Sequence, residues 1–438
     1  MSNFFMALYK SSSSPLFQRF FQPVVDAYPR SEKTYDCQEL TDLDFLEMGI
    51  NRCVSAASTG RDFLQHHGDH GRKEVDTSLH CKALQSERRL TNLQSVNKLI
   101  IPLLTARVED AFASIPELDG FAIYAGDGHY HAVITMMGAA HDEKRESSSG
   151  LMIKLATGHF FLLNLRNHGI SHLTMADQSG TRKKEHDMHA MKRSTFNELR
   201  VGEPKGRKVI LAWDKAGIDF SFWQKAKNTA GLYFLSLEKS NMKLIRCGHR
   251  SFEKGDHRNA GVIDDEQVGP GGGSGGRPPR ALLRRITYVD PVTETKYVYI
   301  TTEMTLPPGI LVLIYKHRWD IEKVFDEFKS KLNEKKSWAS SETAKVIQAQ
   351  FLCLTHNLMV LLEEELLTSE KVDNEKERNR KAMRAEEAKK NGANFIGSAL
   401  QRFTVRSVKY IRWLRNHFYR EIRWSDAVAR LRVIYLSF

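Results

Sequence analysis

The stretch from Ile314 to Leu332 restricts the fold more than any other part of this chain, because its apolar and polar residues separate onto two adjacent helical faces. At about 100° per residue in an α-helix, five apolar side chains fall within one wedge of roughly 60°; they are Ile314, Ile321, Phe325, Phe328 and Leu332. The neighbouring wedge carries a phenol, two cations and one carboxylate, which are Tyr315, Arg318, Lys329 and Glu322. Exposed helix faces usually mix i,i+4 ion pairs without forming such a line. We therefore expect a helix that packs by one face and carries chemistry beside it.

The charge balance points to a polyanionic partner. Lys and Arg exceed Asp and Glu by 65 − 53 = 12, and nucleic acid is the commonest partner of a chain with such an excess. The alternative is a merely basic soluble protein, and charge alone weighs the two about equally.

Cysteine usage and hydropathy indicate the compartment. The five cysteines are far apart and never form a C-x-x-C pair, which argues against a disulfide framework or a zinc ribbon and fits a reducing cytosol. The N-terminus lacks the basic segment and apolar segment of a secretion signal. No apolar run reaches the ~18 residues of a membrane span. We expect a cytoplasmic protein that does not enter a membrane.

The middle of the chain predicts an α/β or mixed sheet. Short apolar runs at 121–126, 131–138 and 159–166 predict three successive strands. A helix is expected over 186–199. The near-continuous apolar run at 209–214 then predicts a buried central strand.

A second block of strands follows, before the helix described above. Four runs indicate these strands, at 231–237, 243–247, 282–289 and 296–302. Between them, the Gly-rich stretch 269–280 is expected to be a flexible cationic loop.

The two ends of the chain are predicted to differ from this β-rich middle. Residues 1–35 are interpreted as a tail. From about 42 to 104 the pattern is helical and basic, with Thr41 or Asp42 as N-cap, and indicates either a DNA-binding module or an ordinary solvated helical domain.

Further helices are expected toward the C-terminus. A long, mostly apolar helix should begin near Ser341 and extend to about Leu367. Residues 370–391 predict a solvated charged helix or linker. The basic, aromatic segment 395–438 predicts helices that contact a second copy or DNA.

Two aspartates sit where a catalytic site could form. Asp127 ends the run 121–126 and precedes Gly128, which permits close approach of a ligand. Asp214 ends the run 209–214. A single aspartate after a strand is more often a loop start, but two of them together with Glu322 match the carboxylate set that binds Mg²⁺ and cleaves phosphodiesters. Asp142 competes with Asp127 for the first position.

The spacing of the polar line resembles a known family. Tyr315, Arg318, Glu322 and Lys329 reproduce Y-x2-R-x3-E-x6-K, the signature of DDE transposases of the insertion-sequence-four type. The flanking R-W-D-I-E-K-V-F-D-E-F-K is similar to the family's R-W-x-I-E-x-x-F-x-x-x-K. The blocks D-P-V-T-E-T-K-Y-V-Y-I-T-T and A-W-D-K-A-G-I-D-F resemble the strand pair before the helix and the region of the second aspartate.

The resemblance implies roles for six residues. Asp127, Asp214 and Glu322 would be the catalytic residues and would bind two Mg²⁺ ions, for which Mn²⁺ can substitute. The DNA phosphate-binding residues would be Tyr315, Arg318 and Lys329. Two positions depart from the usual family pattern, with His129 after Gly128 and Glu303 after Thr302. A competing interpretation of Glu322 is a surface ion pair with Arg318, worth only ~0.3–0.5 kcal/mol. His356 is expected to be a satisfied core residue and Trp319 a packing residue.

The implied fold is α/β (α+β), with a ribonuclease-H-like catalytic core, a β-rich insertion and helical regions at both ends. We expect five regions: a helical DNA-binding region at 1–110, the first part of the core at 111–230, the insertion at 231–308, the second part of the core with the Y-R-E-K helix at 309–370, and a charged helical region at 371–438.

The implied function is that of a transposase. It would bind the terminal inverted repeats of an insertion sequence, cleave DNA and join the freed 3′-OH to a target by a two-metal DDE mechanism. Its partner would be double-stranded DNA, at the element ends and at the target, with a homodimer in the complex and a bacterial cytoplasmic location. Two alternatives remain: a decayed or repurposed DNA-binding protein without catalysis, and a metal-dependent DNA nuclease without strand transfer.

Overall fold

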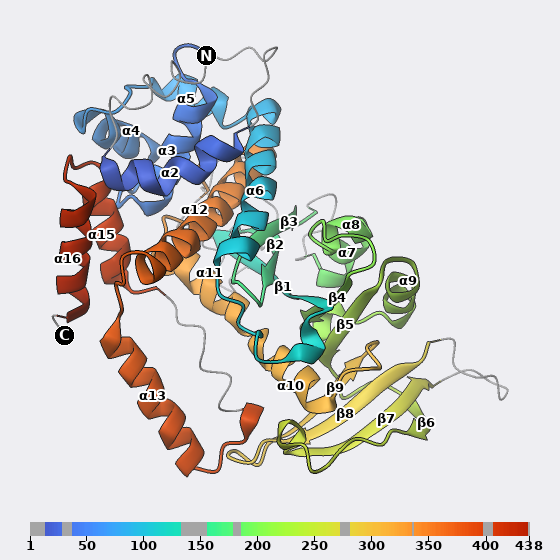
Figure 1. Ribbon diagram of the computed structural model, residues 1–438. Helices are drawn as coiled ribbons and strands as arrows, with labels where there is room; N and C mark the ends of the chain where they lie inside the picture. The colour runs from blue at the N-terminus through green and yellow to red at the C-terminus, as the bar shows by residue number, and fades with distance from the viewer. Residues whose placement is uncertain are drawn as a thin grey trace, which may run out of the picture.

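The computed structural model describes residues 14–28, 37–132, 156–177, 185–271, 281–334, 337–396 and 406–436. Within these ranges the strands form a nine-stranded sheet in the order β3-β2-β1-β4-β5-β9-β8-β7-β6. The strands are β1 (Phe121–Ala132), β2 (Ala156–Asn164), β3 (Ile170–Met175), β4 (Lys208–Trp213), β5 (Leu232–Leu237), β6 (Leu244–His249), β7 (Val262–Pro270), β8 (Leu283–Val289) and β9 (Lys296–Thr301). Figure 1 shows the sheet between a large helical region and a smaller set of helices.

The first five strands have the ribonuclease-H-like arrangement. β1, β2 and β3 form an antiparallel meander, whereas β4 runs parallel to β1 and β5 parallel to β4. The predicted fold class is therefore confirmed. One difference concerns β5, which we expected in the insertion but which completes the core sheet. The runs 121–126 and 131–138 were predicted as separate strands, but β1 is continuous to Ala132 and includes the first two residues of the second run; the rest of that run lies outside the described residues.

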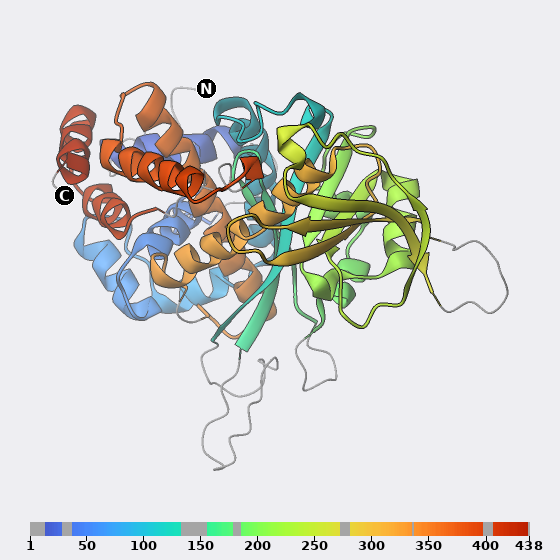
Figure 2. The ribbon, with the colours of Figure 1, turned by 90° about the horizontal axis from the view of Figure 1, so that it is seen from below.

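The insertion extends the core sheet instead of forming a sheet of its own. β9 pairs antiparallel with β5, and β8, β7 and β6 follow. Figure 2 shows this extension as one curved layer. The sequence did not predict β7, because its centre reads D-D-E-Q rather than alternating apolar and polar residues. The buried Asp265 there is satisfied by Arg284 of β8, whose Nη2 lies 2.7 Å from Oδ2.

Helices cover both faces of the sheet. The smaller layer contains α7 (Asp187–Arg193), α8 (Phe196–Leu199) and α9 (Phe220–Ala230). The larger region contains α2 (Pro15–Ala27), α3 (Asp42–Val54), α4 (Gly60–Asp69), α5 (Thr77–Ala83), α6 (Glu87–Arg107), α10 (Pro308–His317), α11 (Asp320–Ser330), α12 (Glu342–Thr368), α15 (Val408–Phe418) and α16 (Trp424–Leu436). The charged α13 (Glu375–Lys390), predicted as a solvated helix, has no buried residue.

Side-chain alternation along β1 and β4 decides which layer each residue faces. Ile123 and Ala125 of β1 share a core with Ile210 and Ala212 of β4 and with α10 to α12. Their neighbours in sequence belong instead to the core with α7 and α9. Asp127 lies two positions after Ala125, and Asp214 lies two positions after Ala212. Both aspartates therefore face α10 and α11.

The N-terminal region is not a tail where it is described. α2 begins after Ser14, whose Oγ accepts the Phe17 N–H at 3.0 Å, and it buries Phe17, Phe20 and Phe21. Phe418 of α15 lies against this helix, with ring centroids 5.1 Å from Phe17. The correction follows from the helical spacing of these aromatic residues, which the tail interpretation overlooked. In Figure 1 α2 and α15 lie in one helical region.

The long helix α12 is the central support of the helical region. It begins after Ser341, as predicted, with Ser341 Oγ accepting the Ala344 N–H at 3.3 Å. Among the described residues it is the one helix long and apolar enough to cross a membrane. Because 89% of its apolar window is buried inside the protein, its apolar character serves the core.

Two predicted helices are each interrupted. The stretch 314–332 is divided between α10 and α11, because the N–H groups of Ile321 and Glu322 bond three residues back, to Arg318 and Trp319, in the 3₁₀ manner. Trp319, at this break, is 57% exposed, so the expectation that Trp319 packs is wrong. The stretch 186–199 is divided where Thr195 starts α8 with a capping box.

A buried group of charges fixes α11 to α12 and to the C-terminal region. Glu327 of α11 accepts from His356 Nδ1 at 2.9 Å and from Arg406 Nη1 at 3.0 Å. His356 Nε2 lies 2.9 Å from the His168 carbonyl, which confirms it as a satisfied core residue. Burial alone would raise the pKa of Glu327, but Arg406 and His356 outweigh it and hold that pKa at about 2.

We expect Glu327→Gln to lower the free energy of unfolding by about 3 kcal/mol, because it leaves the buried Arg406 short of a counter-charge. Urea denaturation at pH 7 measures the change. Glu377→Gln, which removes one partner of a surface pair with Arg380, is the matched control and should cost less than ~0.5 kcal/mol. Equal effects of the two substitutions would contradict the role of Glu327.

The stabilisation from Glu327 should also depend on pH in a defined direction. Its folded pKa lies below the ordinary value of 4.5, so its contribution is present above pH 4.5 and is lost as pH falls toward 2. The difference in unfolding free energy between wild type and Glu327→Gln should therefore shrink between pH 4.5 and pH 3. A difference that stays constant over this range would contradict the prediction.

Candidate active site

The two aspartates directly follow the last paired residues of the parallel β1–β4 ladder. Asp214 follows the end of β4, whereas Asp127 lies inside β1, which continues to Ala132 and pairs there with β2, so the expectation that Asp127 ends its strand is wrong. The β1–β4 ladder closes at Gly126 opposite Trp213, directly before Asp127 and Asp214. Asp127 Oδ1 accepts the Gly128 N–H at 2.7 Å, and Asp214 Oδ1 accepts the Ala216 N–H at 2.7 Å. Each carboxylate thus has one oxygen held by the backbone. The strand register places both carboxylates side by side on the same face of the sheet, where the β1–β4 ladder ends.

The break between α10 and α11 brings three of the predicted residues to this part of the sheet; they are Tyr315, Arg318 and Glu322. Arg318 lies at the break, with Nη1 3.3 Å from Asp127 Oδ2 and Nη2 3.0 Å from Glu322 Oε1. Its guanidinium therefore joins an aspartate of the sheet to the glutamate of the helix. Because Arg318 also reaches Asp127, the contact with Glu322 is more than the isolated surface pair considered from the sequence.

Tyr315 completes the wall of the site from α10. Its ring is buried and meets Tyr299 of β9 edge to face, with centroids 5.3 Å apart. The Arg318 guanidinium lies 5.7 Å from the Tyr315 ring centroid. Burial and the nearby Asp214 raise the pKa of Tyr315, although Arg318 opposes this. The phenol therefore remains a hydrogen-bond donor at neutral pH.

Lys329 lies apart from the other five residues. It is exposed in the last turn of α11, two turns after Glu322 and thus about 10 Å further along the helix axis. At that distance Lys329 does not contact the carboxylates.

Burial strongly affects the first aspartate. It raises the pKa of Asp127 to about 7, although the nearby Arg318 and the Gly128 N–H lower it. Asp214 and Asp187 raise it further. A carboxylate in this environment gains most from an added positive charge.

The donor set suits a divalent cation of the Mg²⁺ type, because hard carboxylate oxygens are the ligands that this ion prefers. In the described part of the chain, however, no three His, Cys, Asp or Glu side chains converge as a metal-binding group. Two of the three predicted ligands are paired with Arg318. Metal binding through all three would require this guanidinium to move.

The sequence did not predict two residues that shape the site, Trp213 and Asp187. The Trp213 ring is fully buried on the face opposite the aspartates and covers Gly126. Its Nε1–H donates to Asp187 Oδ2 at 2.7 Å. The signal in the sequence was the tryptophan directly before Asp214; Asp187 resembled an ordinary acid in the first turn of a helix.

His129 also supports the site, at the position that departs from the usual family pattern. It lies on β1 two residues after Asp127, so it faces α11. Its ring stacks on Phe325 with centroids 4.6 Å apart, and Nε2 lies 2.6 Å from Glu334 Oε2. These contacts tie β1 to α11 and to the segment that follows it. Asp142, the competing first acid, lies outside the described residues.

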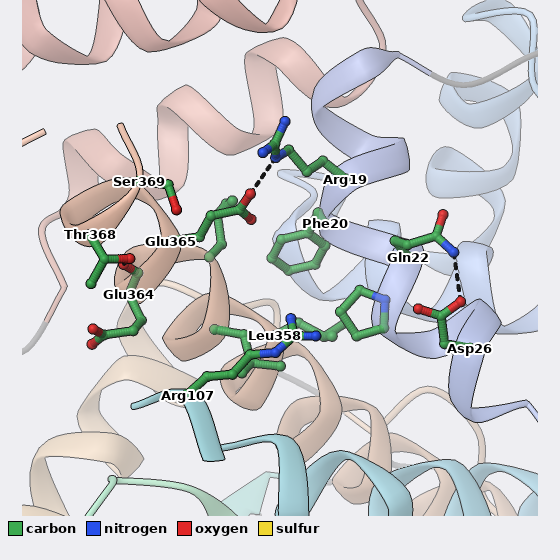
Figure 3. Close-up of a pocket in the computed structure, with 13 residues that line it drawn as sticks. Arg19, Phe20, Gln22, Asp26, Arg107, Leu358, Glu364, Glu365, Thr368 and Ser369 are labelled. Atoms are coloured by element: carbon green, nitrogen blue, oxygen red, sulfur yellow. Dashed lines mark hydrogen bonds and ion pairs between the residues drawn. The ribbon is translucent and has the colours of Figure 1, made fainter. Parts of the chain in front are cut away.

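A pocket elsewhere in the protein is separate from these residues. It has a volume of about 450 Å³ and lies between α2, α6 and α12. Figure 3 shows Arg19 paired with Glu365 and Gln22 bonded to Asp26 in its lining. None of its lining residues belongs to the acidic site, which lies where the β1–β4 ladder ends.

Gly126 is expected to tolerate no side chain. A Cβ there would lie 2.1 Å from the Trp213 ring, so Gly126→Ala should lower the free energy of unfolding by roughly 1–3 kcal/mol. Chemical denaturation measures the loss. Gly120→Ala is the control, because a Cβ there meets nothing within 4 Å. If both variants unfold like wild type, the Trp213 ring does not pack as described.

Comparison with known families finds a similarity over part of the chain. Residues 164–358 match the family model described as the transposase DDE domain. The matched segment contains Asp214 and Glu322 and begins after Asp127, and it covers less than half of the chain. A comparison with curated proteins finds no match. The family match supports a DDE transposase, a family that generally uses divalent metal ions.

Proposed function

We propose that this protein is a transposase that binds the terminal inverted repeats of an insertion sequence, cleaves DNA at its ends and joins the 3′-OH to a target. The observation that carries the proposal is the Arg318 guanidinium, which lies between Asp127 and Glu322 where the β1–β4 ladder ends. The Y-R-E-K spacing of the insertion-sequence-four type agrees with this function.

Asp127, Asp214 and Glu322 would hold Mg²⁺, and two such ions would supply Lewis-acid stabilisation of the oxygens that attack and leave. Arg318 would then pair with a non-bridging phosphate oxygen, since its planar donors suit a phosphate. The Tyr315 hydroxyl can donate to the same phosphate. Lys329 would contact the next phosphates as a point charge.

The reaction proceeds in two displacements at phosphorus. Water attacks the phosphodiester at the element end, the P–O3′ bond breaks and a 3′-OH is released. That 3′-OH then attacks a target phosphodiester, so one P–O bond forms as another breaks. Arg318 offsets negative charge on the phosphate in both displacements.

The partner in this proposal is double-stranded DNA. The net charge of +12 favours a polyanion and predicts affinity that falls steeply with salt. Cutting two element ends calls for a homodimer in the DNA complex. The protein would act in the bacterial cytoplasm.

Cleavage of a labelled duplex ending in the inverted repeat, with Mg²⁺ present, tests the function. Wild type should give nicked and joined products, whereas Asp214→Asn and Glu322→Gln should lose roughly 100-fold or more in rate, as expected on removal of a transition-state interaction. Asp119→Asn, an exposed acid before β1, is the control and should cut normally.

Each outcome of this assay has a distinct meaning. Nicks that never lead to joined strands would replace the transposase with a nuclease. Products unaffected by either substitution would reject the site. A duplex that is bound equally by all variants but never cut would identify a DNA-binding protein without catalysis.

Arg318 should compete with a metal ion for the carboxylates. We expect Arg318→Gln to bind Mn²⁺ about tenfold more tightly in the absence of DNA, because it removes a positive charge held near two of the ligands. The same variant should cut DNA more slowly, since it loses the phosphate contact. Isothermal titration with Mn²⁺ measures the affinity, and weaker binding than wild type would contradict the prediction.

A further inference from the structure

Trp213 is placed so that its ring touches the backbone beside both aspartates. A Cβ on Gly126, the residue before Asp127, would meet the ring at 2.1 Å, and a Cβ on Gly217, three residues after Asp214, would meet it at 2.7 Å. The indole thus lies against both segments where the β1–β4 ladder ends, on the face opposite the acids. Any rotation of this ring would displace one or both segments.

One hydrogen bond determines the orientation of that ring. The indole N–H donates to Asp187 Oδ2 at 2.7 Å, and Asp187 is the first residue of α7. A buried indole N–H without an acceptor is costly, so the ring keeps the orientation in which Asp187 meets it. The Met191 side chain of the same helix lies near Gly217 as well, with its Cε 2.8 Å from a Cβ built there, so α7 packs directly beneath this segment.

We propose that Asp187 is a positioning residue, which acts through the Trp213 indole to hold Asp127 and Asp214 at the separation that a divalent cation requires. This inference rests on the proposed function, because it concerns the same acidic site. Asp187 acts from the opposite face of the sheet and is not itself a ligand. Groups that hydrogen-bond directly to metal ligands typically contribute 10- to 100-fold to metal affinity, and we expect the lower end of this range for Asp187, which acts through one further residue.

A charge-based role for Asp187 is the competing explanation, since its carboxylate lies near both aspartates and raises the pKa of Asp127. The two explanations make opposite predictions for a matched set of variants. Asp187→Asn keeps an oxygen acceptor for the indole but removes the charge. Trp213→Phe keeps the charge but removes the N–H.

The first experiment measures Mn²⁺ affinity by titration of the full chain. We expect Asp187→Ala and Trp213→Phe each to weaken binding roughly 10-fold or more, while Asp187→Asn stays close to wild type. The double variant Asp187→Ala/Trp213→Phe should bind no more weakly than the weaker of the two single variants, because both remove the same link. Additive losses, or a loss in Asp187→Asn with none in Trp213→Phe, would overturn the proposal.

A second measurement needs no metal and separates this inference from the proposed function. Labelling with ¹⁵N-tryptophan gives indole N–H resonances for six tryptophans, and that of Trp213 is the one absent in Trp213→Phe. Asp187→Ala should shift this resonance and speed its hydrogen exchange, whereas Asp187→Asn should restore it. An unchanged resonance in Asp187→Ala would reject the positioning role, whether or not the wild type binds Mn²⁺. If the wild type fails to bind Mn²⁺ while the resonance shifts as expected, the metal site fails and with it the proposed consequence of the link.

Discussion

The parallel pairing of β1 with β4 is the constraint on which the rest of the site depends. Its register aligns Gly126 with Trp213, so the two residues that follow emerge side by side. Strand alternation sends both carboxylates to the face covered by α10 and α11, and the tryptophan to the other face. A shift of one residue in this pairing would separate Asp127 from Asp214 and remove the ring from beneath them. The acids on one face and the indole on the other are thus consequences of a single backbone alignment.

The helices opposite the aspartates, α10 and α11, are held in place by buried charges more than by their intrinsic helix propensity. Glu327 meets Arg406 and His356, while Phe325 stacks on His129, so α11 is fixed both to the C-terminal region and to β1. The 3₁₀ break at Arg318 and Trp319 separates α10 from α11. It places one cation within reach of two carboxylates. A rigid support and a local irregularity therefore act together, as expected where a fold departs from regular geometry at a site.

The sequence predicted the elements of the core sheet well where apolar runs were continuous, as in β4, and where caps were clear, as at Ser341. It failed where the hydrogen-bond partner of a buried polar side chain lies far away in the sequence. β7 was missed because Asp265 finds Arg284 across the sheet, and Trp319 was assigned to packing although a straight wheel at 100° per residue places it away from the apolar wedge. Residue spacing suggested the acids and Arg318, but it could not show that Arg318 bridges two of them. The role of Asp187 could not be predicted from the sequence, because its partner Trp213 lies 26 residues away in the chain.

The contact between α2 and α15 has a consequence for how the protein is made. Phe17 and Phe418 touch, although roughly 400 residues separate them, and contacts of such long range form late in folding. During synthesis, the three phenylalanines of α2 leave the ribosome before α6, α12 and α15, which pack against α2, exist. They remain available to other hydrophobic surfaces until then, which is a recognised route to aggregation. The packing around α2 can therefore be completed only after α15 has been synthesised.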